Sequence, residues 1–217
     1  MTDFTAARTA MVDRQIRPSD VTSFPIIEAM LAIPRERFAP EGQRAVAYAD
    51  APLDLGGGRE ALDPRAFAKM IDGARIGPDD LVLDLAPGLG YSTAVIARMA
   101  AAVIAIEPDE AMAAAATETL SALEIDNALV KTGAVAAGDP DHAPFDAIFV
   151  NGGTGKALDE LCRQLKDGGR LVAVDMSGDA GKAVAFIRNG DDIDRRPLFD
   201  AAAAILPGFE AEAAFAL

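Results

Sequence analysis

The stretch LDLAPGLGYSTAVIA, residues 83–97, determines how the rest of the chain is organised. It opens with an apolar run of the kind that forms a buried strand, and Pro87, Gly88 and Gly90 then favour a tight turn. From Tyr91 onward the apolar residues follow helical spacing. The sequence therefore predicts a strand, a glycine turn and a helix, with backbone N–H groups at the start of the helix facing a ligand.

Composition excludes several classes of function. The 217 residues include 20 Lys and Arg against 34 Asp and Glu, and this net charge of −14, without a basic block, argues against a nucleic-acid partner. No apolar run approaches the roughly 20 residues that span a bilayer, and charges interrupt the N-terminal stretch where a signal peptide would be apolar. We therefore expect a cytoplasmic protein without a membrane partner. Its single Cys162 and single His142 cannot form a Cys/His zinc site, so no metal is expected.

The length suits one domain, residues 1–217, with two segments of different character. Residues 1–80 are expected to be helical, with helices over 24–33 and from Pro64, the second capped by Asp63 and ended by Gly77 and Pro78. No strand is predicted there. The three glycines at 56–58 predict a mobile or close-approach loop.

From residue 81 to 217 strands alternate with helices, which predicts an α/β fold with a parallel sheet. A hairpin is expected over 183–199, and the last apolar stretch to Leu217 is expected to add an edge strand. Gly168 and Gly169 are expected to end the last helix. The other strands are predicted at 82–85, 103–107, 128–131, 147–150 and 171–174, and the helices after Gly90 and at 109–123 and 156–166.

An acidic residue after the glycine turn narrows the choice among possible ligands. Glu107 closes the second strand, where a carboxylate suits a bidentate hydrogen bond to ribose hydroxyls. The alternative for Glu107 is a solvated strand end or a helix cap, because Pro108 follows directly. Ala86 stands where a G-x-G-x-G loop that ends at Gly90 would place its first glycine. Thr93 stands where a G-x-G-x-x-G fingerprint that begins at Gly88 would place its third glycine, which disfavours NAD.

The turn instead looks like the S-adenosylmethionine loop of class I methyltransferases. Six segments resemble the protein-L-isoaspartate(D-aspartate) O-methyltransferase family in order and spacing. They are MVDRQIRPSDV (11–21), IIEAMLAIPRERFAPE (26–41), AYADAPLDLGGG (47–58), LDLAPGLGYSTAVIA (83–97), APFDAIFVNGG (143–153) and LCRQLKDGGRLVA (161–173). The resemblance implies a Rossmann-like, mostly parallel seven-stranded sheet flanked by helices, with an N-terminal helical extension that helps to form the acceptor site. It also implies a role in protein repair.

The resemblance implies S-adenosylmethionine as cofactor and a protein or peptide carboxylate as methyl acceptor. Such a carboxylate is already ionised at neutral pH, so methyl transfer needs alignment more than a general base. Candidate acceptor contacts are Arg59, Glu60 and Asn151, whose alternatives are a solvated charged pair and, for Asn151, a turn. The candidate cofactor contacts are Asp84, Ala86, Pro87, Gly88, Gly90, Tyr91, Glu107, Pro108, Gly133 and Ala134, of which Tyr91 is alternatively an ordinary core residue.

Two other hypotheses remain open. The family's Thr and Ser in the acceptor loop align with Glu60 and Leu62, and a family acidic residue after the third strand aligns with Ala134. These differences favour, as the second hypothesis, a catalytically inactive S-adenosylmethionine-binding regulatory homologue. The third is an NAD-dependent oxidoreductase, which the turn and the lack of a proton-transferring His or Tyr-Lys pair disfavour.

Overall fold

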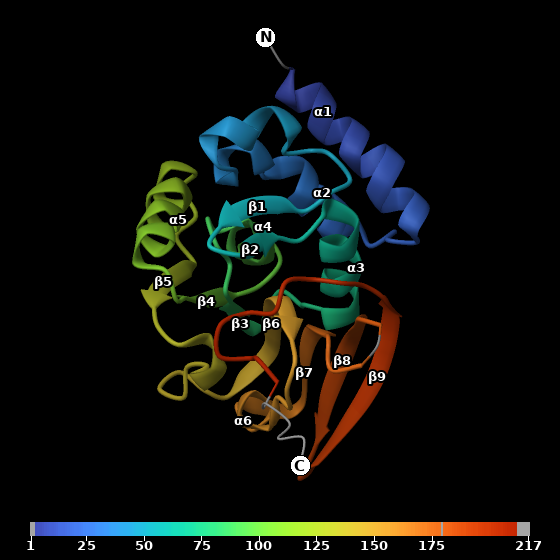
Figure 1. Ribbon diagram of the computed structural model, residues 1–217, viewed down its shortest axis with the longest axis vertical. Coiled ribbons are helices and arrows are strands. Elements are labelled where there is room, and N and C mark those ends of the chain that lie inside the picture. Colours follow the sequence, from blue (N-terminus) through green and yellow to red (C-terminus); the bar gives the residue numbers. More distant parts are fainter. Residues whose placement is uncertain (1–2, 179, 212–217) are drawn as a thin grey trace, which may run out of the picture.

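The computed structural model describes residues 3–178 and 180–211 as an α/β fold around a central sheet (Figure 1). The helices are α1 (Phe4–Met11), α2 (Phe24–Ala32), α3 (Pro64–Ala74), α4 (Tyr91–Ala97), α5 (Glu110–Ala122) and α6 (Asp159–Cys162), with short 3₁₀ or π turns η1 (Val12–Ile16), η2 (Arg17–Ser19), η3 (Arg35–Phe38), η4 (Glu41–Val46) and η5 (Val135–Ala137). The strands are β1 (Leu53–Gly56), β2 (Arg59–Ala61), β3 (Leu81–Leu85), β4 (Ala102–Glu107), β5 (Ala128–Thr132), β6 (Phe145–Thr154), β7 (Leu165–Asp175), β8 (Lys182–Asn189) and β9 (Asp192–Asp200).

The predicted seven-stranded sheet is confirmed, in the order β5-β4-β3-β6-β7-β8-β9. Strands β5 to β7 along this order pair in parallel, whereas β8 and β9 return antiparallel as the expected hairpin. In register, Leu85 of β3 lies opposite Ile106 of β4 on one side and Val150 of β6 on the other. The chain order reverses at β3, so β3 and β6 form the topological switch point of the sheet.

The central strands β3, β4 and β6 are buried on both faces, which explains why they read as continuous apolar runs. Val82 and Val103 point into a core shared with α2, α3 and α4, while Leu83 and Ile104 point into a second core that holds Leu161 of α6. The predicted apolar face of α3, Phe67, Met70, Ile71 and Ala74, is buried in the first core. Figure 1 shows the N-terminal helices and the β1–β2 hairpin gathered at one end of the sheet.

The prediction of no strand in residues 1–80 was wrong. The glycine-rich segment forms the antiparallel β1–β2 hairpin, in which Leu53 pairs with Ala61 and Asp54 with Glu60. Gly56, Gly57 and Gly58 all have positive φ (85°, 61° and 76°), a conformation that glycine adopts without steric cost. Glycine therefore serves here as the turn of a hairpin.

The predicted helix over 156–166 is also mostly wrong. Helix α6 spans only Asp159–Cys162, and Leu165 already pairs with Phe145 as the start of β7. Gly168 and Gly169 accordingly lie within an irregular part of β7. Helix α3 ends at Ala74, before the predicted stop at Gly77, because Arg75 takes a left-handed conformation (φ 49°).

The C-terminal prediction is only partly covered by the structure. Among the described residues, Ile205 makes an isolated bridge to Gly153 and no further strand forms after β9. The last part of the predicted edge strand, residues 212–217, lies outside the described residues. Across residues 3–178 and 180–211, none of the helices combines the length and apolarity needed to cross a bilayer.

Candidate active site

The candidate site lies at the carboxyl ends of β3, β4 and β6, at the switch point where α/β folds bind ligands. The turn 86–90 follows β3 at this edge and leads directly into α4. Gly88 and Gly90 have φ values of 60° and 94°, and a Cβ at Gly90 would stand 2.9 Å from that of Ala116. The predicted strand, glycine turn and helix are confirmed, and this geometry explains why glycine occupies the two positions.

Ala86 stands where the sequence lacks a glycine, and it has a left-handed backbone with φ 56°. This conformation is strained for a residue with a Cβ. The chain holds it there because the Ala86 N–H donates to the carbonyl of Ile106 at 2.8 Å. The turn therefore keeps the shape of a glycine-rich loop with one alanine in it.

Asp84 is fully buried in β3 and organises the floor of the site. One carboxylate oxygen accepts hydrogen bonds from Ser92 Oγ at 2.8 Å and Thr93 Oγ1 at 2.7 Å, and the other accepts one from Asn151 Nδ2 at 2.6 Å. Burial raises the pKa of Asp84 to about 6, and the three donors oppose that rise. Asp84 therefore fixes the turn, α4 and the end of β6 relative to one another.

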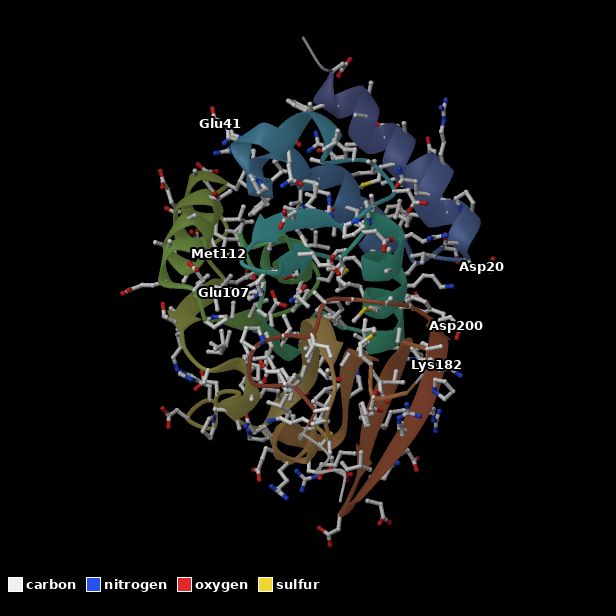
Figure 2. All side chains as sticks on the ribbon, in the orientation of Figure 1. Asp20, Glu41, Glu107, Met112, Lys182 and Asp200 are labelled. Atoms are coloured by element: carbon white, nitrogen blue, oxygen red, sulfur yellow. The ribbon has the colours of Figure 1, made fainter. Side chains whose placement is uncertain are left out.

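Glu107 is also fully buried, at the end of β4 (Figure 2). Its Oε2 accepts from the Gly88 N–H at 2.7 Å and its Oε1 from the Asp109 N–H at 3.1 Å. Arg59 of β2 completes the set with a bidentate ion pair, Nη1 to Oε1 at 2.8 Å and Nη2 to Oε2 at 3.1 Å. Glu107 is thus neither a solvated strand end nor the helix cap, a role that Asp109 takes at α5.

The β1–β2 hairpin covers the glycine turn. Leu55 Cδ1 lies 2.5 Å from the place where a Cβ on Gly88 would stand, so the two elements are in direct contact. Arg59 Nη2 also donates to the Ala86 carbonyl at 3.2 Å. What remains between them is a cavity of about 20 Å³, lined by Arg35, Leu55, Glu60, Ala61, Leu62, Phe67, Ala86, Pro87, Tyr91, Ser92 and Asn151.

Of the three candidate acceptor contacts, two line the cavity and one points to Glu107. Asn151 lines the cavity, with its amide donating to Asp84 and to the Leu85 carbonyl. Glu60 also lines it but accepts from the Ala204 N–H at 2.9 Å. Arg59 is directed at Glu107, on the side where the ribose was predicted. The charged pair Arg59 and Glu60 is therefore not merely solvated.

The remaining candidate cofactor contacts surround Glu107 less closely. Gly133 donates its N–H to the Glu107 carbonyl at 3.1 Å, Pro108 is half-buried and Ala134 is exposed. Tyr91 borders the cavity, and its ring also packs against Phe38 and Phe67. Tyr91 thus combines the two roles that the sequence left open, a core residue that reaches the site wall.

Comparison with known proteins identifies the family. The sequence model of protein-L-isoaspartate(D-aspartate) O-methyltransferase (PCMT) matches residues 6–193. A protein-L-isoaspartate O-methyltransferase of Roseiflexus castenholzii is 37% identical over 198 residues, which cover 91% of this chain and 90% of that protein. One of Pelotomaculum thermopropionicum is 39% identical over 166 residues, 76% of this chain and 72% of that protein. The chain belongs to the protein-L-isoaspartate O-methyltransferase family.

Solved structures agree on the fold of this methyltransferase. A protein-L-isoaspartate O-methyltransferase structure superposes with a TM-score of 0.82 at 22% identity, covering 94% of this chain and 67% of the other. A Plasmodium falciparum protein described as a family member in complex with S-adenosyl-L-homocysteine gives 0.79 at 19% identity, covering 95% and 99%. Both include the N-terminal helical region, so the class I methyltransferase fold with its N-terminal extension is confirmed.

Sequence reasoning missed one charged residue in this methyltransferase. Arg35 is 2% exposed and lines the cavity, with its guanidinium carbon 4.6 Å above the Tyr91 ring centroid. Its Nε donates to the Ala47 carbonyl and its Nη2 to that of Leu62, both at 2.8 Å. The only signal in the sequence was the position of Arg35 in IPRERF, within the N-terminal segment that the resemblance assigns to the acceptor side.

The residues of this methyltransferase suit S-adenosylmethionine in kind. Glu107 offers two carboxylate oxygens for a ribose diol, and the turn offers backbone groups close to a ligand. The cavity beside Arg35 and Asn151, which Glu107 does not line, has a volume of about 20 Å³, whereas small-molecule sites need about 300 to 1,000 Å³. Glu107 and the turn therefore offer groups of the right kind for the cofactor, and Arg59 of the β1–β2 hairpin is bonded to both Glu107 oxygens.

Proposed function

We propose that this chain is an S-adenosylmethionine-dependent carboxyl methyltransferase that acts on isoaspartyl or D-aspartyl residues of peptides and proteins. The observation that carries the proposal is the placement of Glu107 beside the turn 86–90, at the switch point of a methyltransferase sheet. All the residues that line the cavity lie within the stretch that matches the family.

The residues divide the work between two sides. Glu107 would hold the ribose, and the turn backbone would meet the amino-acid end of the cofactor. S-adenosylmethionine, when bound, supplies an electrophilic methyl group on its sulfonium. The acceptor carboxylate needs no base at neutral pH, so the task of the chain is to place it and to exclude water.

The cavity wall provides groups for that placement. Arg35 brings a buried positive charge to the wall, and Asn151 brings an amide fixed by Asp84. A guanidinium pairs well with a carboxylate in a buried place. We assign the acceptor side to Arg35 and Asn151, with Leu62 closing the wall between them and α3.

Methyl transfer from radiolabelled S-adenosylmethionine tests the function. The acceptor is a peptide with one isoaspartyl residue, and the matched control is the same peptide with a normal aspartyl residue. We expect label in the isoaspartyl peptide only, as a base-labile ester. Equal label in both peptides, or none in either, would contradict the proposed reaction.

A second candidate is a family member that binds the cofactor without transferring methyl groups. It is favoured by the loop over residues 59–63, because glutamate and leucine at positions 60 and 62 have no hydroxyl to offer an acceptor. Glu60 instead bonds to the Ala204 N–H, and Leu62 is 5% exposed. Calorimetry separates the two candidates. Binding of S-adenosylhomocysteine with no transfer to the isoaspartyl peptide would select the second.

A further inference from the structure

The ion pair between Arg59 and Glu107 occupies the place that the cofactor ribose requires. Each Glu107 oxygen accepts one backbone N–H from the sheet edge and one guanidinium N–H from Arg59. The backbone donors Gly88 and Asp109 belong to the turn after β3 and to the start of α5. Two ribose hydroxyls are also a pair of donors, so they and the Arg59 guanidinium compete for the same two oxygens.

The Arg59 side chain is held in an incompletely satisfied way. It is 7% exposed, and its Nε is buried with no hydrogen-bond partner among the described residues. A buried ion pair gains little net stability because desolvation offsets the attraction, and an unpaired buried N–H adds a further cost. The Arg59–Glu107 ion pair therefore has a specific geometry but little net stability, so another set of donors can replace Arg59 at a low cost in free energy.

The hairpin that carries Arg59 is a short element. Its strands are short, four and three residues, and its turn consists of glycines. A two-stranded hairpin is only marginally stable by itself, so its position depends on its contacts. Those at the site are Leu55 on Gly88, Arg59 on Glu107 and on the Ala86 carbonyl, and Glu60 on the Ala204 N–H. Away from the site, the Gln43 side chain bonds to the backbone N–H and carbonyl of Asp54 in β1.

We propose that the β1–β2 hairpin is a gate over the cofactor site, in which Arg59 substitutes for the ribose and Leu55 covers the glycine turn. The inference rests on the proposed function, since it concerns the same S-adenosylmethionine site. The cofactor reaches Glu107 only after the hairpin swings away. The apparent dissociation constant is the intrinsic one divided by the fraction of open molecules, so loosening the gate strengthens binding.

Two substitutions loosen the gate from different contacts. Arg59→Gln removes the competing guanidinium, and Leu55→Ala removes the contact with Gly88 while keeping the ion pair. The matched control is Arg65→Gln, because Arg65 is an exposed arginine on α3 whose Nε lies 3.8 Å from Asp50. Leu55→Ala also keeps the test valid should Arg59→Gln fold poorly.

Calorimetric titration with S-adenosylhomocysteine measures the effect. We expect both gate variants to bind at least threefold more tightly than the wild type, and Arg65→Gln to bind as the wild type does. Hydrogen exchange without ligand gives an independent readout. The amides of Leu53–Gly56 and Arg59–Ala61 should exchange at least threefold faster in both gate variants and at the wild-type rate in the control.

The outcomes separate the gate from the proposed function. Wild-type binding together with equal or weaker binding by both folded gate variants would overturn the gate and leave the cofactor assignment intact. Absence of binding by the wild type and by every variant would overturn the cofactor assignment and the gate with it. Unchanged hydrogen exchange in both variants would likewise contradict the gate.

Discussion

Asn151 donates its side-chain amide to Asp84 across 2.6 Å, and this bond joins β6 to the carboxyl-terminal part of β3. Asp84 is the buried carboxylate whose pKa burial raises to about 6. Glu107 is the nearby acid whose charge adds to that rise. The stability of the protein should therefore depend on pH in a way that Asp84 determines.

A raised carboxyl pKa stabilises the fold most when pH is below the unfolded value near 4, and that stability is lost as pH rises through about 6. Asp84→Asn removes this titration. As pH rises from 4 to 7, the free energy of unfolding of the variant should increase relative to that of the wild type by on the order of 3 kcal/mol, since one pKa unit is about 1.4 kcal/mol. Urea unfolding of both proteins at each pH measures the difference.

Other acids cancel in that comparison. The pKa values of Asp139, Asp146 and Asp175 are lowered by their partners, and both proteins contain them. Only the difference between the two pH profiles reports on Asp84. Parallel profiles would show that Asp84 is not the group responsible.

The Arg59–Glu107 ion pair should show strong energetic coupling. Arg59→Met or Glu107→Gln alone leaves a buried group without its partner, which typically costs about 3 to 5 kcal/mol. The double variant should cost less than the sum by about 1 to 3 kcal/mol. Guanidinium unfolding of the four proteins gives the coupling energy, and strict additivity would contradict it.

Removal of the Glu107 side chain should prevent ligand binding. Glu107→Ala should abolish binding of S-adenosylhomocysteine, because the ribose loses both acceptor oxygens. Calorimetry on protein shown to be folded by circular dichroism measures this. Retention of wild-type affinity by folded Glu107→Ala protein would remove Glu107 from the cofactor site.

Ala86→Gly should stabilise the protein. Ala86 has φ 56°, where a Cβ costs roughly 1 to 2 kcal/mol, and glycine removes this cost. The greater unfolded-state entropy of glycine costs less, about 0.5 to 1 kcal/mol. The matched control is Ala114→Gly at an exposed position inside α5, which should cost about 1 kcal/mol. Thermal melts of both variants measure the opposite signs, and a loss of stability with Ala86→Gly would contradict the strain.

Leu62→Ser tests how the acceptor loop works. Leu62 is 5% exposed and lines the cavity, so a serine there places a hydroxyl donor beside the acceptor position. We expect higher kcat/KM for the isoaspartyl peptide, together with a stability loss of about 1 to 3 kcal/mol from the lost apolar burial. The control is Leu62→Ala, which loses the same burial without the hydroxyl and should not raise kcat/KM.

Much of the fold was predictable because its signals are local. A parallel strand buried on both faces is a continuous apolar run, and the residues of β3 and β4 show this clearly. The cap of α3 is equally local, since Asp63 accepts from the Ala66 N–H three residues later. The turn 86–90 belongs to the same class, because glycine and proline mark turns within a few residues.

The failures have non-local causes. The β1–β2 hairpin holds charged residues and glycines, so it lacks the alternation that predicts strands, and its place is set by packing on Gly88. Leu165 has helical spacing after Leu158 and Leu161, yet its pairing with Phe145 draws it into β7. Arg59 and Glu107 are 48 residues apart in sequence, and only the folded sheet brings them together.

The hydrogen bond from the Ala204 N–H to Glu60 gives the distant end of the described chain a hold on the hairpin. The segment after β9 returns to β6, where the Leu206 N–H donates to the Gly153 carbonyl. This segment therefore contacts both β6 and the hairpin. A spectroscopic label placed at the exposed Ile205 would therefore report hairpin motion without touching the cofactor site. The proposed gate would then be observable as a change in the signal of that label when S-adenosylhomocysteine is added.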